Sequence, residues 1–141
     1  MKQMWTSWTQ ETSWWKQVLL LAFAVVLSFG ISITPAWATT VSQLPDVSAG
    51  EETWVVDDAD VLSRLNEGTV SKKLQQLAEE TGEEVRLVTV YRLKYGETID
   101  SFTEQLFEQW FPTPEASAHQ VLLVLDTLTN KSAIRVGEEV N

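Results

Sequence analysis

Residues 121–125 read VLLVL, five apolar residues in succession. An apolar run of this length is typical of a strand at the centre of a sheet, covered on both of its faces. Strands of this kind belong to α/β proteins, in which helices lie on both sides of a mostly parallel sheet. The run therefore predicts an α/β fold for the part of the chain around it.

The segments near this run have strand patterns of their own. Residues 85–91 (VRLVTVY) are rich in β-branched side chains, and residues 54–56 (WVV) form a shorter run of the same kind, so both predict strands. Residues 126–131 are polar and predict a turn. Residues 132–136 then predict a further strand, the hairpin partner of the central one.

Two helices are expected between these strands. Ser63 can cap the first, whose apolar residues recur three to five positions apart, and Gly82 is a typical end for it. The second begins at Thr98 or at Ser101, and Pro112 follows its end. The resulting order, β-α-β-α-β-β, predicts an α/β sandwich with right-handed crossovers and a mixed, mostly parallel sheet. Because α/β domains usually exceed about 100 residues, we expect the chain to be the N-terminal portion of a longer domain.

The first 38 residues predict a signal peptide. Lys16 precedes residues 18–33, an uncharged and mostly apolar run, and Ala36-Trp37-Ala38 places small residues at the two positions that a signal peptidase recognises. The apolar run has 16 residues, which as a helix would span about 24 Å, less than the ~30 Å hydrocarbon core of a bilayer. We therefore predict export across a membrane and cleavage after Ala38, rather than an uncleaved anchor.

The rest of the chain divides into a predicted linker, residues 39–53, which is polar and contains Pro45 and Gly50, and a domain over residues 54–141. The net charge is −10, although the first 38 residues contain one more basic than acidic residue. No basic stripe exists to neutralise phosphates, so nucleic-acid binding is excluded, and adsorption to an anionic lipid surface is disfavoured. With no cysteine and one histidine, the chain cannot form disulfides, thiolate nucleophiles or His-rich metal sites.

Three carboxylates follow strands of the predicted sheet: Asp57 and Asp58 after the first strand, and Asp126 after the central one. Ligands of open α/β sheets gather outside the carboxyl ends of the strands. Carboxylates brought together there can hold a divalent cation, Ca²⁺ or Mg²⁺, that polarises a phosphoryl oxygen or activates water. Aspartate at a strand end also caps helices and starts turns, so a purely structural role is the competing interpretation. Tyr91, Arg92 and Lys94 follow another strand and could form a small electropositive lip.

The motif VVDDADVLS at residues 55–63 resembles the opening of the TPM domain family. The resemblance extends over residues 54–141 in the correct order and spacing, through Leu74, Leu77, Thr81-Gly82, residues 85–90, Leu106-Phe107-x-x-Trp110, residues 121–125 and residues 134–137. Members of this family include thylakoid-lumen acid phosphatases and photosystem II repair factors. The signal peptide, the acidic domain and the lack of cysteine are most similar to the photosystem II repair branch.

The resemblance implies an α/β/α sandwich in the thylakoid lumen, with the periplasm as the alternative compartment, and more sheet and helix after Asn141. It places the family's acidic site on Asp57, Asp58 and Asp126. It also implies contact with the thylakoid membrane, through partners or through a C-terminal anchor. One departure is visible, because many relatives have Asn-Gly just before the central strand, where this chain has His119-Gln120.

Two functions follow from these patterns. The first is an accessory protein that binds photosystem II subunits or assembly intermediates without catalysis. The second is a metal-assisted acid phosphatase acting on phosphomonoesters, with the three aspartates as cation ligands. The sequence shows no evident nucleophile or general acid, so catalytic residues stay unassigned and the accessory role is favoured.

Overall fold

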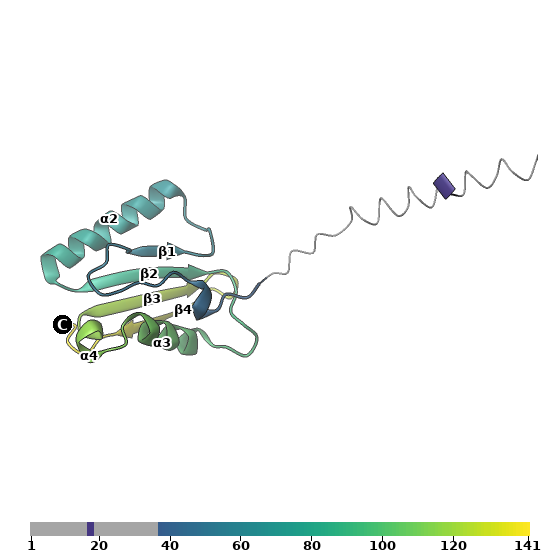
Figure 1. Ribbon diagram of the computed structural model, residues 1–141. Coiled ribbons are helices and arrows are strands. Elements are labelled where there is room, and N and C mark those ends of the chain that lie inside the picture. Colours follow the sequence, from purple (N-terminus) through teal and green to yellow (C-terminus); the bar gives the residue numbers. More distant parts are fainter. Residues whose placement is uncertain (1–16, 19–36) are drawn as a thin grey trace, which may run out of the picture. The chain divides into compact units, whose positions relative to one another are not determined.

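Four strands form one sheet in the order β1-β2-β3-β4 (Figure 1). They span Val55–Asp57 (β1), Glu84–Val90 (β2), Gln120–Asp126 (β3) and Lys131–Val136 (β4). The computed structural model describes residues 17, 18 and 37–141 of the chain. Residues 37–141 form a compact unit that contains the whole sheet.

The sheet is parallel across β1, β2 and β3, and β4 runs antiparallel to β3 as its hairpin partner. The three parallel strands therefore end on the same side, at Asp57, Val90 and Asp126, where β4 begins at Lys131. We call this side the carboxyl end of the sheet. The predicted strands and the predicted hairpin are all present, and the mixed, mostly parallel sheet is confirmed.

Two longer helices connect the parallel strands. Helix α2 (Arg64–Thr81) begins after Ser63, whose side chain accepts a hydrogen bond from Asn66 N at 3.2 Å, and it ends at Gly82, which has the left-handed φ of 78°. Both termini agree with the prediction. Helix α3 (Ile99–Trp110) begins after Thr98, not Ser101, because Thr98 Oγ1 accepts from Ser101 N at 3.1 Å.

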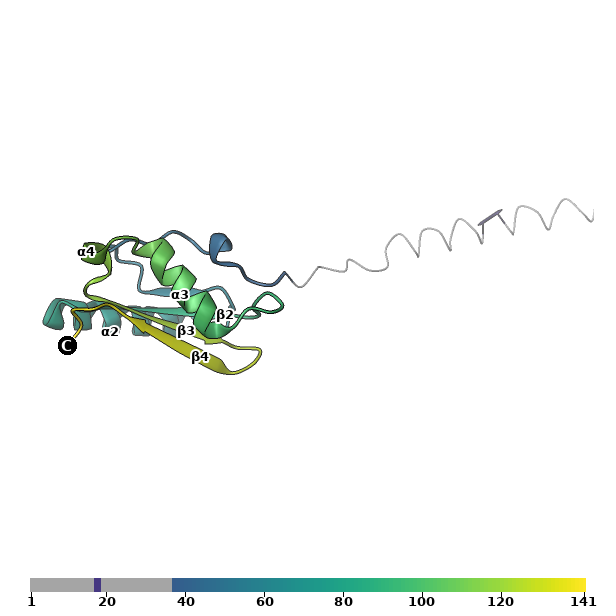
Figure 2. The same ribbon diagram turned by 90° about the horizontal axis from the view of Figure 1, so that it is seen from below.

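The two helices lie on opposite faces of the sheet (Figure 2). Helix α2 packs on β1 and β2, and α3 packs on β3 and β4. The α/β/α arrangement predicted from the sequence is therefore confirmed, with one helix for each face. A single turn, α4 (Pro114–Ser117), with Pro114 at its first position, follows α3.

The core lies on the α3 face. Along β3 every second residue is buried there, whereas Val121, Leu123 and Leu125 on the α2 face are only partly buried. Helix α2 itself has no buried residue, while half of α3 is buried. Most of the core side chains come from β2, β3 and α3, among them Val88, Val90, Leu122, Val124, Phe102, Leu106, Phe107 and Trp110.

Residues 39–53 differ from the linker expected for them. Leu44 and Val47 are buried in the core, and Val41, in the short 3₁₀ helix η1 (Val41–Gln43), packs against it. The Trp110 indole donates to Pro45 O at 3.0 Å, which holds the segment on α3. The polar residues of this stretch suggested a linker, but the apolar side chains three residues apart seal the edge of the core.

Arg86 of β2 fastens the same segment to the sheet. Its side chain is 1% exposed and donates to three backbone carbonyls of the segment, Ser48 O at 3.1 Å, Glu51 O at 2.9 Å and Thr53 O at 3.2 Å. Its remaining contacts are to Glu84 Oε2 at 2.9 Å and to Gln120 Oε1, and its guanidinium lies over the Trp54 and Phe111 rings. These contacts satisfy a charge that would otherwise be buried at high cost.

Candidate functional site

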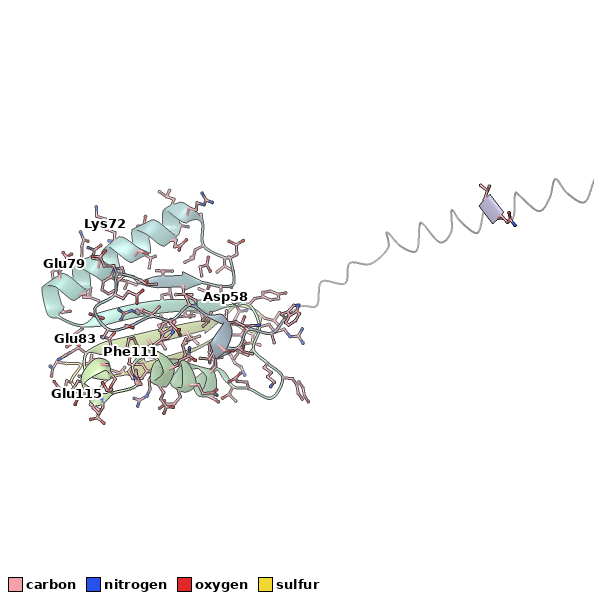
Figure 3. All side chains as sticks on the ribbon, viewed as in Figure 1. Asp58, Lys72, Glu79, Glu83, Phe111 and Glu115 are labelled. Atoms are coloured by element: carbon pink, nitrogen blue, oxygen red, sulfur yellow. The ribbon has the colours of Figure 1, made fainter. Side chains whose placement is uncertain are left out.

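The carboxyl end of the sheet brings the three predicted aspartates to the same side of the domain. Asp57 is the last residue of β1, Asp58 is the first residue after it, and Asp126 is the last residue of β3. Among the residues that Figure 3 labels, Asp58 lies at this end, and Glu83 and Glu115 lie at the opposite one. The topology thus places the predicted residues where the sequence expects them.

Asp57 organises the loop that joins β1 to α2. Its Oδ1 accepts hydrogen bonds from Val61 N at 3.2 Å and from the Thr89 hydroxyl, and its Oδ2 accepts from Leu62 N at 2.7 Å. Both carboxylate oxygens are therefore engaged by the protein itself. The loop turns sharply through Asp60, which has a φ of 50°.

The environment of Asp57 keeps its side chain ionised. Burial by itself would raise the pKa of this carboxyl group, but the hydrogen bonds from Thr89, Leu62 and Val61 stabilise the charged form and outweigh it. The net result is a pKa below the ordinary value of 3.8. Asp57 therefore presents a carboxylate rather than a carboxylic acid at neutral pH.

Asp58 holds the start of the domain. Its Oδ2 accepts from Thr39 Oγ1 at 2.7 Å, across nineteen residues of chain. Thr39 is in turn fixed by its own nitrogen, which donates to Arg92 O at 2.7 Å, and by an isolated parallel bridge to Leu93. Asp58 and the loop after β2 thereby clamp Thr39 at the carboxyl end.

Asp126 forms the tight turn between β3 and β4. It is 5% exposed, and its Oδ1 accepts from Leu128 N at 3.0 Å and from Thr129 N at 3.2 Å. Its Oδ2 accepts from the Thr129 hydroxyl at 2.8 Å. A short carboxylate that binds the backbone two and three residues on is a standard turn initiator.

Asp57 and Asp126 lie on opposite faces of the sheet. In the strand register Asp57 is level with Thr89 and Asp126 with Val90, and side chains of adjacent residues in a strand point to opposite faces. The strands β1 and β3 are separated by β2, a spacing of about 10 Å. A single cation bound by all three aspartates would need Asp126 to leave its turn.

Within residues 37–141 no group of three or more acidic, histidine or cysteine side chains is arranged to hold a metal ion. Two hollows that border α3, of about 370 and 820 Å³, contain none of the three aspartates. Ca²⁺ or Mg²⁺ binding by Asp57, Asp58 and Asp126 stays a prediction.

Two threonines of this site were not expected from the sequence. The sequence signal for Thr89 is that it is a polar residue within the otherwise apolar end of strand β2. In the structure its hydroxyl donates a hydrogen bond to Asp57. Thr39 had no local signal, because its contacts are to Asp58 and to the loop after β2. A contact between residues so far apart along the chain has no sequence periodicity to indicate it.

Comparisons with known proteins identify a family and several relatives of this chain. A model of the TPM domain matches residues 55–141. A chloroplastic UPF0603 protein of Arabidopsis thaliana is 29% identical over 116 residues, covering 81% of this chain and 41% of that protein. A chloroplastic UPF0603 protein of Oryza sativa subsp. indica is 34% identical over 87 residues, covering 62% of this chain and 29% of that protein. The chain thus spans less than half the length of these relatives.

The fold also matches a solved structure. The solution NMR structure of the N-terminal domain of a protein from P. gingivalis superposes with a TM-score of 0.65 at 23% sequence identity. The match covers 73% of this chain and 66% of that one. At this identity the likeness concerns the fold alone.

Proposed function

The chain belongs to the TPM domain family, and from this premise we propose that it is an accessory protein in the repair or assembly of photosystem II, acting by protein binding. Two observations support the proposal. The sequence is most similar in character to the photosystem II repair branch of the family, and the curated relatives are named as chloroplastic proteins. The partners would be photosystem II subunits or assembly intermediates.

The proposed compartment is the thylakoid lumen, with the periplasm as the alternative. The proposal rests on the signal peptide predicted for residues 1–38, most of which lie outside the residues that the structure describes. Within the described residues no helix is both long and apolar enough to cross a bilayer. An exported domain would reach the membrane through its partners or through an anchor elsewhere in the protein.

The observation that favours binding over catalysis is the local engagement of the aspartates. Asp57 and Asp126 use both of their carboxylate oxygens to hold loops, and they lie on opposite faces of the sheet. These contacts are the structural role that aspartate commonly has at strand ends. A folded acidic surface is sufficient for an accessory protein.

Binding can be measured with the full chain immobilised and purified photosystem II core complexes or monomeric assembly intermediates in solution. We expect saturable binding that weakens as salt is raised from about 0.05 to 0.3 M, because the chain has a net charge of −10 and exposed charges are screened. An unrelated acidic protein of similar charge, immobilised at the same density, is the control. Equal signals from the two proteins would refute a specific interaction.

The second candidate function is a metal-assisted phosphatase, and one observation favours it. Asp57 is held ionised at the carboxyl end by hydrogen bonds from the Thr89 hydroxyl and from the backbone N–H groups of Val61 and Leu62, and Asp58 follows it in the chain. Asp57 and Asp58 would hold Ca²⁺ or Mg²⁺, with Asp126 joining them only after release from its turn. A bound cation of this type supplies Lewis-acid polarisation of a phosphoryl oxygen.

Hydrolysis of a phosphomonoester by the purified chain with Ca²⁺ or Mg²⁺ decides between the two functions. Under the accessory-protein proposal we expect no turnover above background with either metal. The variants Asp57→Asn and Asp126→Asn test the site, and Asp100→Asn, an exposed residue of α3, is the matched control. Metal-dependent turnover that is lost in the first two variants and kept in the third would make the phosphatase the correct function.

A further inference from the structure

Helix α2 carries a basic surface on an otherwise acidic domain. Residues 37–141 contain eight basic and nineteen acidic side chains. Three of the basic ones and none of the acidic ones line a hollow of about 440 Å³ on this helix, and we call its lining the basic face of α2. The lining residues are Arg64, Leu65, Gly68, Thr69, Lys72, Lys73 and Gln76. The local charge is therefore opposite to that of the chain as a whole.

The three cations of the basic face have no acidic partner in their own domain. Arg64, Lys72 and Lys73 are exposed, and none of them forms an ion pair with another residue of the described part of the chain. Figure 3 shows Lys72 on the side of α2 that is turned away from the strands. Basic side chains in this position can pair with the carboxylates of another molecule.

The acidic residues near the basic face lie at its borders. Glu67 is half-buried and is two positions from Leu65, which places it on the other side of the helix. Glu79 and Glu80 lie in the last turn of α2, and Asp60 precedes the helix. The basic face is thus a limited region with acidic residues beyond both of its ends.

Gly68 lies in the middle of the basic face and accounts for its hollow shape. A Cβ atom at this position would meet nothing within 4 Å, so the packing of the domain does not require a glycine here. Glycine within a helix is less stable than alanine, but it lets another backbone approach closely. Leu65, one turn earlier, is 80% exposed and offers an apolar contact beside the gap. A partner backbone over Gly68 would explain a glycine that the domain itself does not need.

We propose that the basic face of α2 binds an acidic helix of a partner protein. The partner backbone lies over Gly68, and one of its apolar side chains packs against Leu65. Its carboxylates pair with Arg64, Lys72 and Lys73. These three positions extend over nine residues of α2, or about 14 Å, which corresponds to two to three turns of a partner helix.

A short acidic helix matches this face better than a long polyanion does. Nucleic acid or an anionic lipid surface would extend beyond the three cations to Asp60, Glu79 and Glu80, which would repel it. A helix of two to three turns can end before these carboxylates. The inference rests on the proposed protein-binding function, for which it names the contact surface and the chemistry of the partner.

The charge contacts are tested with the immobilised full chain and purified photosystem II core complexes or monomeric assembly intermediates. The double variant Lys72→Glu/Lys73→Glu reverses two charges of the basic face. Lys94→Glu/Lys131→Glu is the matched control, because it changes the net charge equally at two exposed positions outside α2. We expect the dissociation constant to rise about tenfold or more in the first variant and less than about threefold in the control.

The close approach is tested by Gly68→Leu, which fills the hollow. Its melting temperature should not fall, because the position is open and leucine is the better helix former, yet its binding should weaken about tenfold or more. Asn66→Leu is the matched control, since Asn66 is an exposed residue of α2 that does not line the hollow, and it should bind as the wild type does.

The outcomes separate this inference from the function on which it rests. A wild-type chain that binds neither core complexes nor assembly intermediates would refute the protein-binding function and the inference together. Wild-type binding that Lys72→Glu/Lys73→Glu and Gly68→Leu both retain would overturn the inference alone, as would equal losses in the variants and their controls. Binding of the wild type to phosphatidylglycerol vesicles that Lys72→Glu/Lys73→Glu abolishes would also overturn it, since the face would then bind lipid.

Discussion

At the scale of single residues, Arg86 shows how the domain accommodates a buried charge. Its guanidinium is surrounded by acceptors, three of them backbone carbonyls of residues 48–53, and it lies within 5.4 Å of the centres of the Trp54 and Phe111 rings. The planar guanidinium group has five N–H donors and can bind several acceptors at once. A lysine ammonium group could not reach the same acceptors in this geometry. The burial of Arg86 could not be predicted from the sequence, because an arginine in a strand is usually exposed.

Replacing Arg86 by methionine should destabilise the domain by about 3 kcal/mol or more, because Glu84 and the backbone carbonyls would lose a buried partner. Arg92→Met, at an exposed position, is the matched control and should change stability by no more than about 0.5 kcal/mol. Urea unfolding followed by tryptophan fluorescence measures both. Similar midpoints for the two variants would show that the buried contacts of Arg86 contribute little.

The pH dependence of stability should report on Glu84. Burial alone would raise the pKa of this carboxyl group, but hydrogen bonds from Gly50 N, Gln120 and Arg86, with the charge of Arg86, lower it below the ordinary value of 4.5. A carboxyl group whose pKa is lower in the folded state stabilises the fold above its ordinary pKa, and this contribution disappears as pH falls. Glu84→Gln should therefore be less stable than the wild type at pH 7, and the difference should shrink as pH falls below 4.5. A difference that stays constant over this range would contradict the assigned cause.

At the scale of elements, the strands and helices were predictable and the packing of residues 39–53 was not. Ser63, Gly82 and the apolar runs of β2 and β3 are local signals, and each has the expected effect. Thr98 and Ser101 were equivalent as caps by local pattern. The tertiary structure favours Thr98, because Ile99 is then the first residue of α3 and reaches the core. Residues 39–53 combine a few apolar positions with many polar ones, and only contact with α3 and Arg86 orders them.

The contact between α4 and the end of β4 makes a glycine necessary. A Cβ atom at Gly137 would overlap Ser117 O and would lie 2.5 Å from Ala118 O, both backbone atoms. Gly137→Ala should therefore lower the melting temperature by separating α4 from the sheet. Gly68→Ala is the matched control: Gly68 lies within α2 with nothing within 4 Å of the added Cβ, so alanine should stabilise by about 0.5–1 kcal/mol. Thermal unfolding of both variants should show shifts of opposite sign, and a common sign would refute the explanation.

At the scale of the whole molecule, the sequence predicted that the three aspartates lie at the carboxyl end of the sheet, but it did not predict how their side chains are arranged there. Parallel strands place Asp57, Asp58 and Asp126 at one end whatever the details of pairing. Whether Asp57 and Asp126 share a face depends on register, and a shift of one residue would move every side chain of a strand to the other face. Register is set by packing across the sheet, so the separation of these two carboxylates could be seen only in the structure.

The clamp on Thr39 has a consequence for the predicted cut after Ala38. A protease needs an exposed, detachable stretch around the bond it cleaves, but Thr39 is 6% exposed and bridged to Leu93. Signal peptidase should cleave the urea-unfolded chain much faster than the folded chain. Thr39→Ala, which removes the contact to Asp58, should speed cleavage of the folded form, and Gly68→Ala should not. Equal rates for folded and unfolded wild type would show that the clamp does not protect the bond.

Cleavage at that position would also change what Thr39 is chemically. Its nitrogen, now an amide that donates to Arg92 O, would become the terminal ammonium of the mature chain, in the same residue whose hydroxyl contacts Asp58. A terminal amino group has a pKa of about 8 and is mainly charged at neutral pH. The mature protein would then supply its own cation to Asp58, in competition with any divalent ion, and precursor and product would differ in charge at the surface where a metal is predicted.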